Sequence, residues 1–209
     1  MSDDYRSAFQ DAFNVSRETI ERLDQYARLV EKWNPAINLI SKSSVGVLWQ
    51  RHFHDSAQLY EFRQDKPCHW VDLGSGGGFP ALILAIFSLE FTPADRFTLV
   101  ESDLRKSVFL QIVIRELGLN AKVIAERIEK TAPLNADILT ARALSSLDKL
   151  LEYAELHLKS SGFALFPKGE KYKKELESSI VMWNFQVEEF TSQTNQYGAI
   201  LKIGDITRV

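Results

Sequence analysis

The sequence has little cysteine and no long apolar run. Cys68 is the single cysteine among 209 residues, which excludes an internal disulfide and a cysteine-based zinc site and fits a reducing compartment. The longest apolar run, residues 81–87, is too short to cross a bilayer. The N-terminus is acidic and leads into no apolar signal core, so we expect a cytoplasmic protein without membrane contact.

An excess of basic residues is also missing. Lys and Arg number 25 against 28 Asp and Glu, which gives a net charge of -3 and a pI of about 5.9. Such a chain has no general attraction for nucleic acid, so any RNA contact requires a local basic patch. The 45% hydrophobic content suffices for one buried core. Because no exposed seam for a second copy stands out, we expect a monomer.

The chain divides into a helical segment, residues 1–66, and a segment of alternating strands and helices, residues 67–209. In the first segment Ser16 is a candidate N-cap, Asn34-Pro35 is expected to end the helix that follows, and a second helix is expected over 45–62. In the second, strands are predicted at 69–73, 97–101, 121–125, 137–141 and 163–166, and helices at 80–89, 104–117, 147–158 and 170–180.

Gly118 and Gly162 are placed where helix-ending glycines are expected. Two further strands, 184–191 and 199–203, are joined by a short link and read as a hairpin. The pattern predicts an α/β fold with a mostly parallel, Rossmann-like sheet that finishes in an antiparallel pair.

The most informative run is VDLGSGGGFP at residues 71–80. It reads as a buried strand, a tight glycine turn with free backbone N–H groups, and a helix opened by Pro80. Gly74 and Gly76 supply the first two glycines of the dinucleotide fingerprint G-x-G-x-x-G, but Phe79 stands where the third belongs. No lysine follows the glycines as a P-loop requires. A cofactor with adenosine but no phosphates fits better, and we expect S-adenosylmethionine.

An acidic residue supports a nucleoside cofactor. Glu101 is the last residue of the second predicted strand, where a carboxylate can accept hydrogen bonds from both ribose hydroxyls. A solvated acid at a strand end is the alternative reading. The methionine end of the cofactor would lie against the N–H groups of residues 74–78.

A series of short segments runs in order along the chain: KWN at 32–34, INL at 37–39, RHF at 51–53 with DS at 55–56, VDLGSG at 71–76 with GFP at 78–80, RK at 105–106 with FL at 109–110, RIE at 127–129, ARA at 141–143 and KG at 168–169. In these segments the chain resembles the RsmG (GidB) family, bacterial methyltransferases of 16S ribosomal RNA. Two positions depart from the family: Gly77 is commonly alanine or proline, and Ala81 replaces a usual glycine.

The resemblance implies a class I S-adenosylmethionine-dependent methyltransferase that modifies N7 of a guanine in the 530 loop of 16S rRNA, in the small ribosomal subunit or its precursor. By position, Gly74, Phe79, Ile128, Glu129 and Arg142 match the family's cofactor contacts. Gly76 and Glu101 are also expected to bind the cofactor, on the grounds given above for the glycine loop and the ribose.

Guanine N7 is an exposed lone pair, so its methylation needs no general base, and we expect none. Cys68 precedes its strand, away from the crevice, which argues against a cysteine-dependent mechanism. No Asn-Pro-Pro-aromatic or Asp-Pro-Pro-aromatic run follows the fourth strand, which disfavours methylation of amino groups.

The substrate candidates are Arg51, His52, Arg142 and Lys168. Arg51 and His52 either touch the cofactor loop or the RNA, or are structural; His52 and His54 point to different helix faces, so we expect no metal site. Lys168 belongs to a basic cluster with Lys171, Lys173 and Lys174 that either holds phosphates or is a solvated helix start. Arg105 and Lys106 likewise either contact RNA or are solvated surface residues. Trp33, Trp49 and Phe53 are expected in the core.

Two other functions remain open at this point. A small-molecule methyltransferase fits the acidic pI, and a cofactor-binding RNA module without catalysis would keep the same loop. The motif series from residue 32 to residue 169 argues against both.

Overall fold

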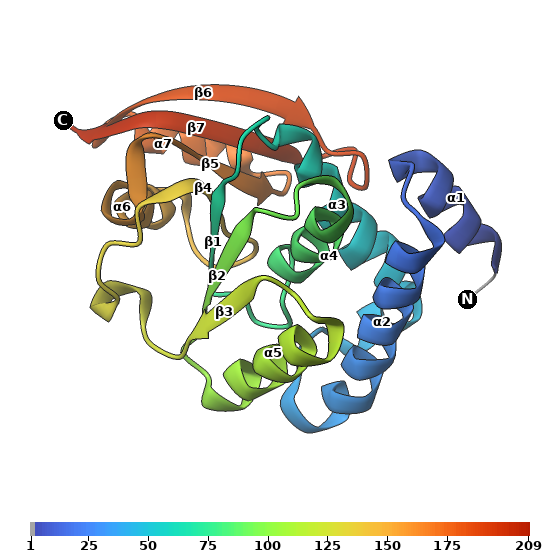
Figure 1. The fold of residues 1–209 in the computed structure, drawn as a ribbon. Helices are drawn as coiled ribbons and strands as arrows, with labels where there is room; N and C mark the ends of the chain where they lie inside the picture. The colour runs from blue at the N-terminus through green and yellow to red at the C-terminus, as the bar shows by residue number, and fades with distance from the viewer. Residues whose placement is uncertain (1–2) are drawn as a thin grey trace.

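Residues 3–209 are described by a computed structural model, in which they form a seven-stranded sheet with helices on both faces (Figure 1). The spatial order is β3-β2-β1-β4-β5-β7-β6, with the first five strands parallel and β7 antiparallel to both neighbours. The predicted fold class and the terminal hairpin are therefore confirmed. The strands are β1 (His69–Leu73), β2 (Arg96–Val100), β3 (Ala121–Ile124), β4 (Ala136–Thr140), β5 (Leu158–Lys168), β6 (Trp183–Thr191) and β7 (Ala199–Arg208).

Seven α-helices and four 3₁₀- or π-helical turns complete the described part of the chain. The α-helices are α1 (Asp3–Phe13), α2 (Arg17–Ile37), α3 (Asp55–Ala57), α4 (Ala81–Phe91), α5 (Leu104–Leu117), α6 (Leu147–His157) and α7 (Tyr172–Ser179). The turns are the 3₁₀ segments η1 (Lys42–Val47), η3 (Gln58–Phe62) and η4 (Ile128–Lys130), and the π-helical η2 (Trp49–His54).

Side chains that alternate along the central strands belong to two hydrophobic cores, one on each face of the sheet. Trp70 of β1 packs with α4, α5 and the N-terminal helices, whereas Val71 and Leu73 pack with α6 on the opposite face. In Figure 1, α6 and α7 accordingly lie on the other side of the sheet from α2, α4 and α5. All five residues of β1 are buried, as expected for a central parallel strand.

The N-terminal helices cover α4 and share its core. Eight consecutive residues of α4, from Ala81 to Ser88, are buried, because the sheet packs on one side and α2 and α3 on the other. A helix that is apolar all round requires such double coverage. Phe9, Tyr26 and Phe53 belong to the same hydrophobic cluster as Trp70. The division of the chain at residue 66 remains a prediction.

The expected stop at Asn34-Pro35 is wrong. Helix α2 continues through Pro35 to Ile37 and ends at Asn38, whose φ of 50° is left-handed and whose N–H donates to the Asn34 carbonyl oxygen. A proline this close to the end removes one hydrogen bond without disrupting the preceding turns. The Ser16 cap is confirmed, since its side chain accepts a hydrogen bond from the Thr19 N–H.

Two further expectations need correction. The single helix expected over 45–62 is instead the series η1, η2, α3 and η3; residues 42–47 are rich in serine, glycine and valine, which are weak helix formers. Gly162 does not end a helix: α6 stops at His157, and Gly162 lies inside β5. A Cβ there would come within 2.7 Å of the Ala136 carbonyl oxygen, so the close approach of β4 requires glycine. Gly118 does end α5, with φ of 64°.

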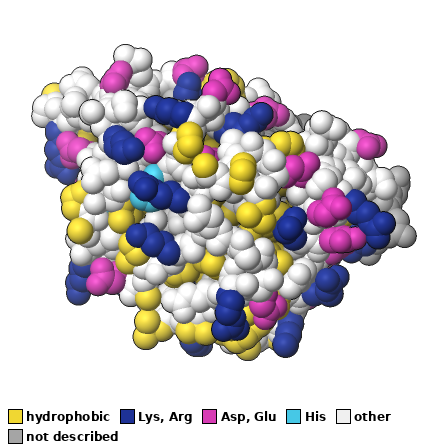
Figure 2. Space-filling model, in the orientation of Figure 1, with side chains coloured by type: hydrophobic (Ala, Val, Ile, Leu, Met, Phe, Trp, Pro, Cys, Tyr) yellow, Lys and Arg dark blue, Asp and Glu magenta, His cyan; other side chains and the backbone are white. Residues whose placement is uncertain are grey.

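The surface carries both charge signs. On the face shown in Figure 2, Lys and Arg side chains are interspersed with Asp and Glu rather than gathered in one block. Within residues 3–209, no helix combines the length and apolar character needed to cross a membrane.

Candidate active site

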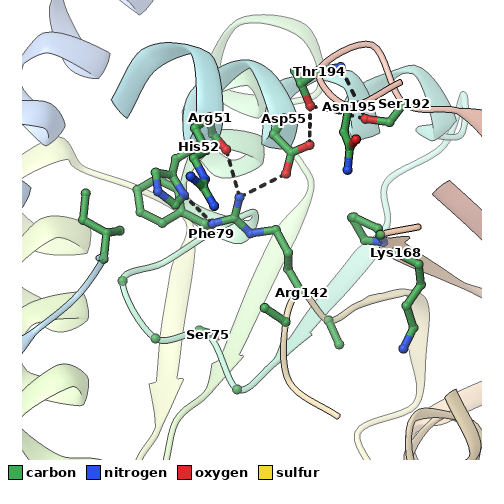
Figure 3. Close-up of a pocket in the computed structure, with 18 of the residues that line it drawn as sticks. Arg51, His52, Asp55, Ser75, Phe79, Arg142, Lys168, Ser192, Thr194 and Asn195 are labelled. Atoms are coloured by element: carbon green, nitrogen blue, oxygen red, sulfur yellow. Dashed lines mark hydrogen bonds and ion pairs between the residues drawn. The ribbon is translucent and has the colours of Figure 1, made fainter. Parts of the chain in front are cut away.

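A pocket of about 1020 Å³ opens at the carboxyl ends of β1, β4 and β5. This is the edge at which open α/β sheets bind ligands. Its wall combines the glycine loop, the η2 segment, the turn after β4, the end of β5 and the loop between β6 and β7 (Figure 3). Seven of the predicted site residues line it: Gly74, Gly76, Phe79, Arg51, His52, Arg142 and Lys168.

The glycine loop folds tightly onto the end of β2. Gly74 and Gly76 have φ values of 66° and 55°, which favour glycine. The N–H groups of Gly74 and Ser75 both donate to the Val100 carbonyl oxygen, at 2.8 and 3.1 Å, and that of Gly78 donates to the Ser75 carbonyl oxygen at 2.7 Å. The expectation of free N–H groups across the loop is therefore wrong for these three residues, because their N–H groups already donate to carbonyl oxygens of β2 and of the loop itself.

Glu101 holds the glycine loop by a hydrogen bond from outside the pocket lining. One carboxylate oxygen accepts from the Gly76 N–H and the other from the Asp103 N–H, each at 2.8 Å. The side chain is buried, with 8% exposure, and does not line the pocket. The sequence reading placed Glu101 correctly at the end of β2 but did not anticipate this bond to the loop. Its ribose contact remains a prediction.

Asp72 is a buried carboxyl group beneath the loop. The Thr140 hydroxyl donates to its Oδ1 at 2.7 Å, whereas Oδ2 is buried with no hydrogen-bond partner among the described residues. Burial raises the pKa of Asp72 to about 6. A buried acceptor without a partner is uncommon in proteins, and Asp72 does not itself line the pocket.

Arg142 lies two residues beyond β4 and is held from several sides (Figure 3). Its Nη1 donates to Asp55 Oδ2 at 3.0 Å and its Nη2 to His52 Nδ1 at 2.7 Å. The guanidinium carbon lies 5.3 Å from the centre of the Phe79 ring. Burial, Arg142 and Arg51 lower the pKa of His52 to about 4, so the ring is neutral at pH 7 and Nδ1 can accept this bond. The predicted site residues Arg142, His52 and Phe79 thus form one cluster.

The two histidines of η2 point to different places, as predicted. His54 packs edge-on against Phe9 and Phe13 of α1, with ring centres 6.0 and 4.9 Å apart, whereas His52 faces Arg142. Trp49 and Phe53 are fully buried and Trp33 packs against the same cluster, which confirms their assignment to the core.

Lys168 lines the pocket but is already paired. Its Nζ donates to Glu175 Oε2 at 2.7 Å and to the Ser145 carbonyl oxygen at 3.0 Å, and the side chain is 9% exposed. Phosphate binding by Lys168 would have to compete with Glu175. Lys171, Lys173 and Lys174 are exposed on or beside α7, away from the pocket lining.

Ile128 and Glu129 do not line the pocket. They lie in η4, after β3, where Ile128 is buried and Glu129 accepts a hydrogen bond from the Tyr153 hydroxyl. Their cofactor contact stays a prediction. The pocket also contains polar residues that were not predicted as site residues, among them Asp55, Ser192, Thr194 and Asn195. Asp55 was noted only in the matching segment DS at 55–56, with no role assigned, and the other three carry no motif.

Comparison with known proteins agrees with this geometry. The family profile of GidB, described as rRNA small subunit methyltransferase G, matches residues 19–198. A relative named ribosomal RNA small subunit methyltransferase G, from Ruegeria pomeroyi, is 55% identical over 196 residues, which cover 94% of this chain and 96% of the relative. A relative of the same name from Cereibacter sphaeroides is 47% identical and covers 95% and 96%.

The chain belongs to the rRNA small subunit methyltransferase G family. This confirms the resemblance seen in the sequence. Solved structures agree at the level of fold: a SAM-dependent methyltransferase from Aquifex aeolicus has a TM-score of 0.58 at 16% identity, covering 75% of this chain and 91% of its own. TYW2 from M. jannaschii, in complex with AdoMet, has a TM-score of 0.54 at 14% identity and covers 76% of both chains.

Proposed function

We propose that the protein transfers the methyl group of S-adenosylmethionine to N7 of a guanine in the 530 loop of 16S rRNA. The observation that carries this proposal is the family match over residues 19–198, which includes the glycine loop and the turn after β4 that form the pocket. We further propose that the protein acts as a cytoplasmic monomer on the small ribosomal subunit or its precursor.

The residues of the pocket fit this cofactor. Gly74 and Gly76 line it without side chains, and Phe79 offers an aromatic ring. Asp72, at the end of β1 next to the loop, keeps one carboxylate oxygen without a partner among the described residues, although it does not itself line the pocket. In this proposal Gly74, Gly76, Phe79 and Arg142 contact the cofactor directly. Glu101 would take the ribose, and Ile128 and Glu129 the adenine edge.

The reaction requires alignment rather than proton transfer. Bound S-adenosylmethionine would supply a methyl group on a sulfonium: the carbon–sulfur bond would break as the N7 lone pair bonds to the carbon, the sulfur would leave as a neutral thioether, and N7 would need no deprotonation. Holding the two reactants in line can contribute about 7–11 kcal/mol. The pocket residues therefore act by orientation: none needs to serve as a general base.

The substrate side is formed by Arg51, His52, Arg142 and Lys168. Arg51 is exposed at the rim and Lys106 lines the same pocket, so both can reach RNA phosphates. His52 is neutral at pH 7 and holds Arg142 rather than a phosphate. Lys168 would contribute only after leaving Glu175.

Transfer of labelled methyl groups tests the proposal. Purified protein is given labelled S-adenosylmethionine with small-subunit particles, naked 16S rRNA or a metabolite mixture, and the RNA is mapped for 7-methylguanosine. We expect label at one guanine of the 530 loop, and a loss of at least tenfold for Arg142→Ala with an unchanged circular dichroism spectrum.

The other outcomes contradict the proposal in different ways. Label confined to small molecules would identify a small-molecule methyltransferase. RNA binding and cofactor binding without transfer would identify a module without catalysis. The absence of cofactor binding in calorimetry would exclude each of these functions.

A further inference from the structure

Asp55 uses both oxygens of its carboxylate to join three distant segments (Figure 3). Oδ2 accepts from Arg142 Nη1 at 3.0 Å, and Oδ1 accepts from the Thr194 hydroxyl at 2.6 Å. Gln58 Nε2 donates to the same Oδ1 at 3.1 Å. The carboxylate therefore connects the N-terminal helical segment to the turn after β4 and to the loop between β6 and β7.

A second bond holds the same loop in place. The Gln193 N–H donates to Gln58 Oε1 at 2.9 Å, beside the bond between Thr194 and Asp55. Ser192, Thr194 and Asn195 line the pocket from this loop. The loop of the terminal hairpin thus forms one wall of the pocket, and it is held by Gln58 and by Asp55, which also pairs with Arg142.

The contacts of Arg142 decide which of its donors face a ligand. Two donor contacts of Nη1 go to Asp55 and to the Arg51 carbonyl oxygen, at 3.0 and 3.4 Å, and one of Nη2 goes to His52. Of the five guanidinium N–H groups, the Nε–H and one Nη2–H have no partner among the described residues. The ion pair is largely buried, with side-chain exposures of 16% and 18%, so Asp55 restrains the guanidinium where water competes weakly.

We propose that Asp55 is the positioning residue of this methyltransferase: by holding Arg142 and Thr194 together, it aims the remaining donors of Arg142 into the pocket and completes the pocket wall. The proposal rests on the proposed function, because it assigns Asp55 a role in methyl transfer. Asp55 acts through Arg142 and does not itself touch the reacting atoms.

Methyl transfer by single and double variants tests this role. Asp55→Asn keeps the shape of the side chain but removes its negative charge. We expect kcat/KM for rRNA to fall at least tenfold. In the Arg142→Ala background the same change should alter it less than twofold, because its target is gone. Thr194→Val, which leaves the ion pair intact, should cost less than Asp55→Asn, and Asp55→Glu should restore part of the lost activity.

Asp137→Asn is the matched control. Asp137 lies at the opposite end of β4 and pairs with Lys159 at 2.6 Å, outside the pocket lining, so its replacement should leave kcat/KM within twofold. Wild-type activity of Asp55→Asn would overturn the proposal. Equal losses from Asp55→Asn with and without Arg142 would overturn it too, because Asp55 would then act independently of Arg142.

A substrate-free measurement separates this proposal from the proposed function. Nitrogen-15 NMR of arginine side chains should show restrained, resolved Nη–H signals for Arg142 in the wild type and their loss in Asp55→Asn, with Arg105 on α5 unchanged. If the wild type methylates no rRNA, the proposed function fails while these spectra still report whether Asp55 holds Arg142. Unchanged Arg142 signals in Asp55→Asn would overturn the positioning role. If Asp55→Asn does not fold, Thr194→Val and Asp55→Glu carry the test, and activity of Asp55→Glu no higher than that of Arg142→Ala would then overturn it.

Discussion

Replacement of Gly78 by alanine tests whether the glycine loop needs its glycines for packing as well as for backbone conformation. Gly78 has φ of 95°, and a Cβ there would lie 2.8 Å from Leu82 Cγ and 2.8 Å from the Tyr26 hydroxyl oxygen. The Tyr26 hydroxyl cannot move away freely, because it donates to the Gly77 carbonyl oxygen. Gly78→Ala therefore combines a disfavoured backbone conformation with a collision in the core.

The expected loss is the sum of two costs. A left-handed conformation costs a residue with a Cβ about 1–2 kcal/mol, and overpacking of a dense core costs about 1–3 kcal/mol. Gly78→Ala should therefore lower the free energy of unfolding by roughly 2–5 kcal/mol. For a domain of this size that corresponds to a Tm about 4–20 °C lower.

Two other glycines of the chain separate these costs. Gly118 has φ of 64° but open space around its Cβ position, so Gly118→Ala should show the backbone cost alone, about 1–2 kcal/mol. Gly46 has open space and no left-handed φ, so Gly46→Ala should be neutral or slightly stabilising. Urea unfolding followed by circular dichroism measures all three. A loss for Gly78→Ala no larger than that for Gly118→Ala would refute the collision.

Three further predictions concern RNA binding, the pH dependence of stability and the single cysteine. Replacing Arg51 and Lys106 by alanine should weaken RNA binding and reduce the slope of log K against log salt by about 0.7 per lost phosphate contact, measured by titration at several salt concentrations; an unchanged slope would exclude both from phosphate binding. The folded protein keeps His52 neutral down to about pH 4, whereas the unfolded chain takes up its proton near pH 6.5, so stability falls as the pH drops through this range. His52→Gln should therefore lose about 1–2 kcal/mol less than the wild type between pH 7 and pH 5 in urea unfolding, and an identical loss would show that His52 does not titrate as described. Cys68→Ala should transfer methyl groups at the wild-type rate, since Cys68 is buried before β1 and far from the pocket lining; a large loss of transfer by the folded variant would point to thiol chemistry.

Elements with local signals were predictable from the sequence. Helix α5 was predicted with its observed bounds and with Gly118 at its end; the structure adds the cap of its first turn by Asp103. Strand β1 was also predicted with its observed bounds, since an apolar run meets the glycine turn at Gly74. These signals are properties of a few adjacent residues, so one sequence contains them fully.

The errors have two origins. At Pro35 the missed signal is local: α2 ends two residues later, at Ile37, and the left-handed Asn38 follows as its cap. The other errors arose where residues distant in the sequence decide the structure. Gly162 has its role from the backbone of β4, not from a helix end. In the site, Thr194 meets Asp55 across 139 positions of the chain, and no periodicity or spacing encodes such a pair. His52 and Phe79 were predicted site residues, but the bond between Asp55 and Thr194 appeared only with the fold.

The charge of the pocket explains how an acidic protein can attract RNA. The charged side chains that line it are Arg51, Asp55, Lys106, Arg142, Lys168 and Glu175. Asp55 is paired with Arg142 and Glu175 with Lys168, so the net positive charge at the pocket comes from Arg51 and Lys106. At physiological salt, exposed charges farther than about 8 Å are largely screened. On the face shown in Figure 2 the charged side chains of both signs are interspersed, so we expect a phosphate at the rim to respond mainly to these two residues. Affinity for RNA should then be modest, and most of the specificity must come from the shape of the pocket that Asp55 holds together.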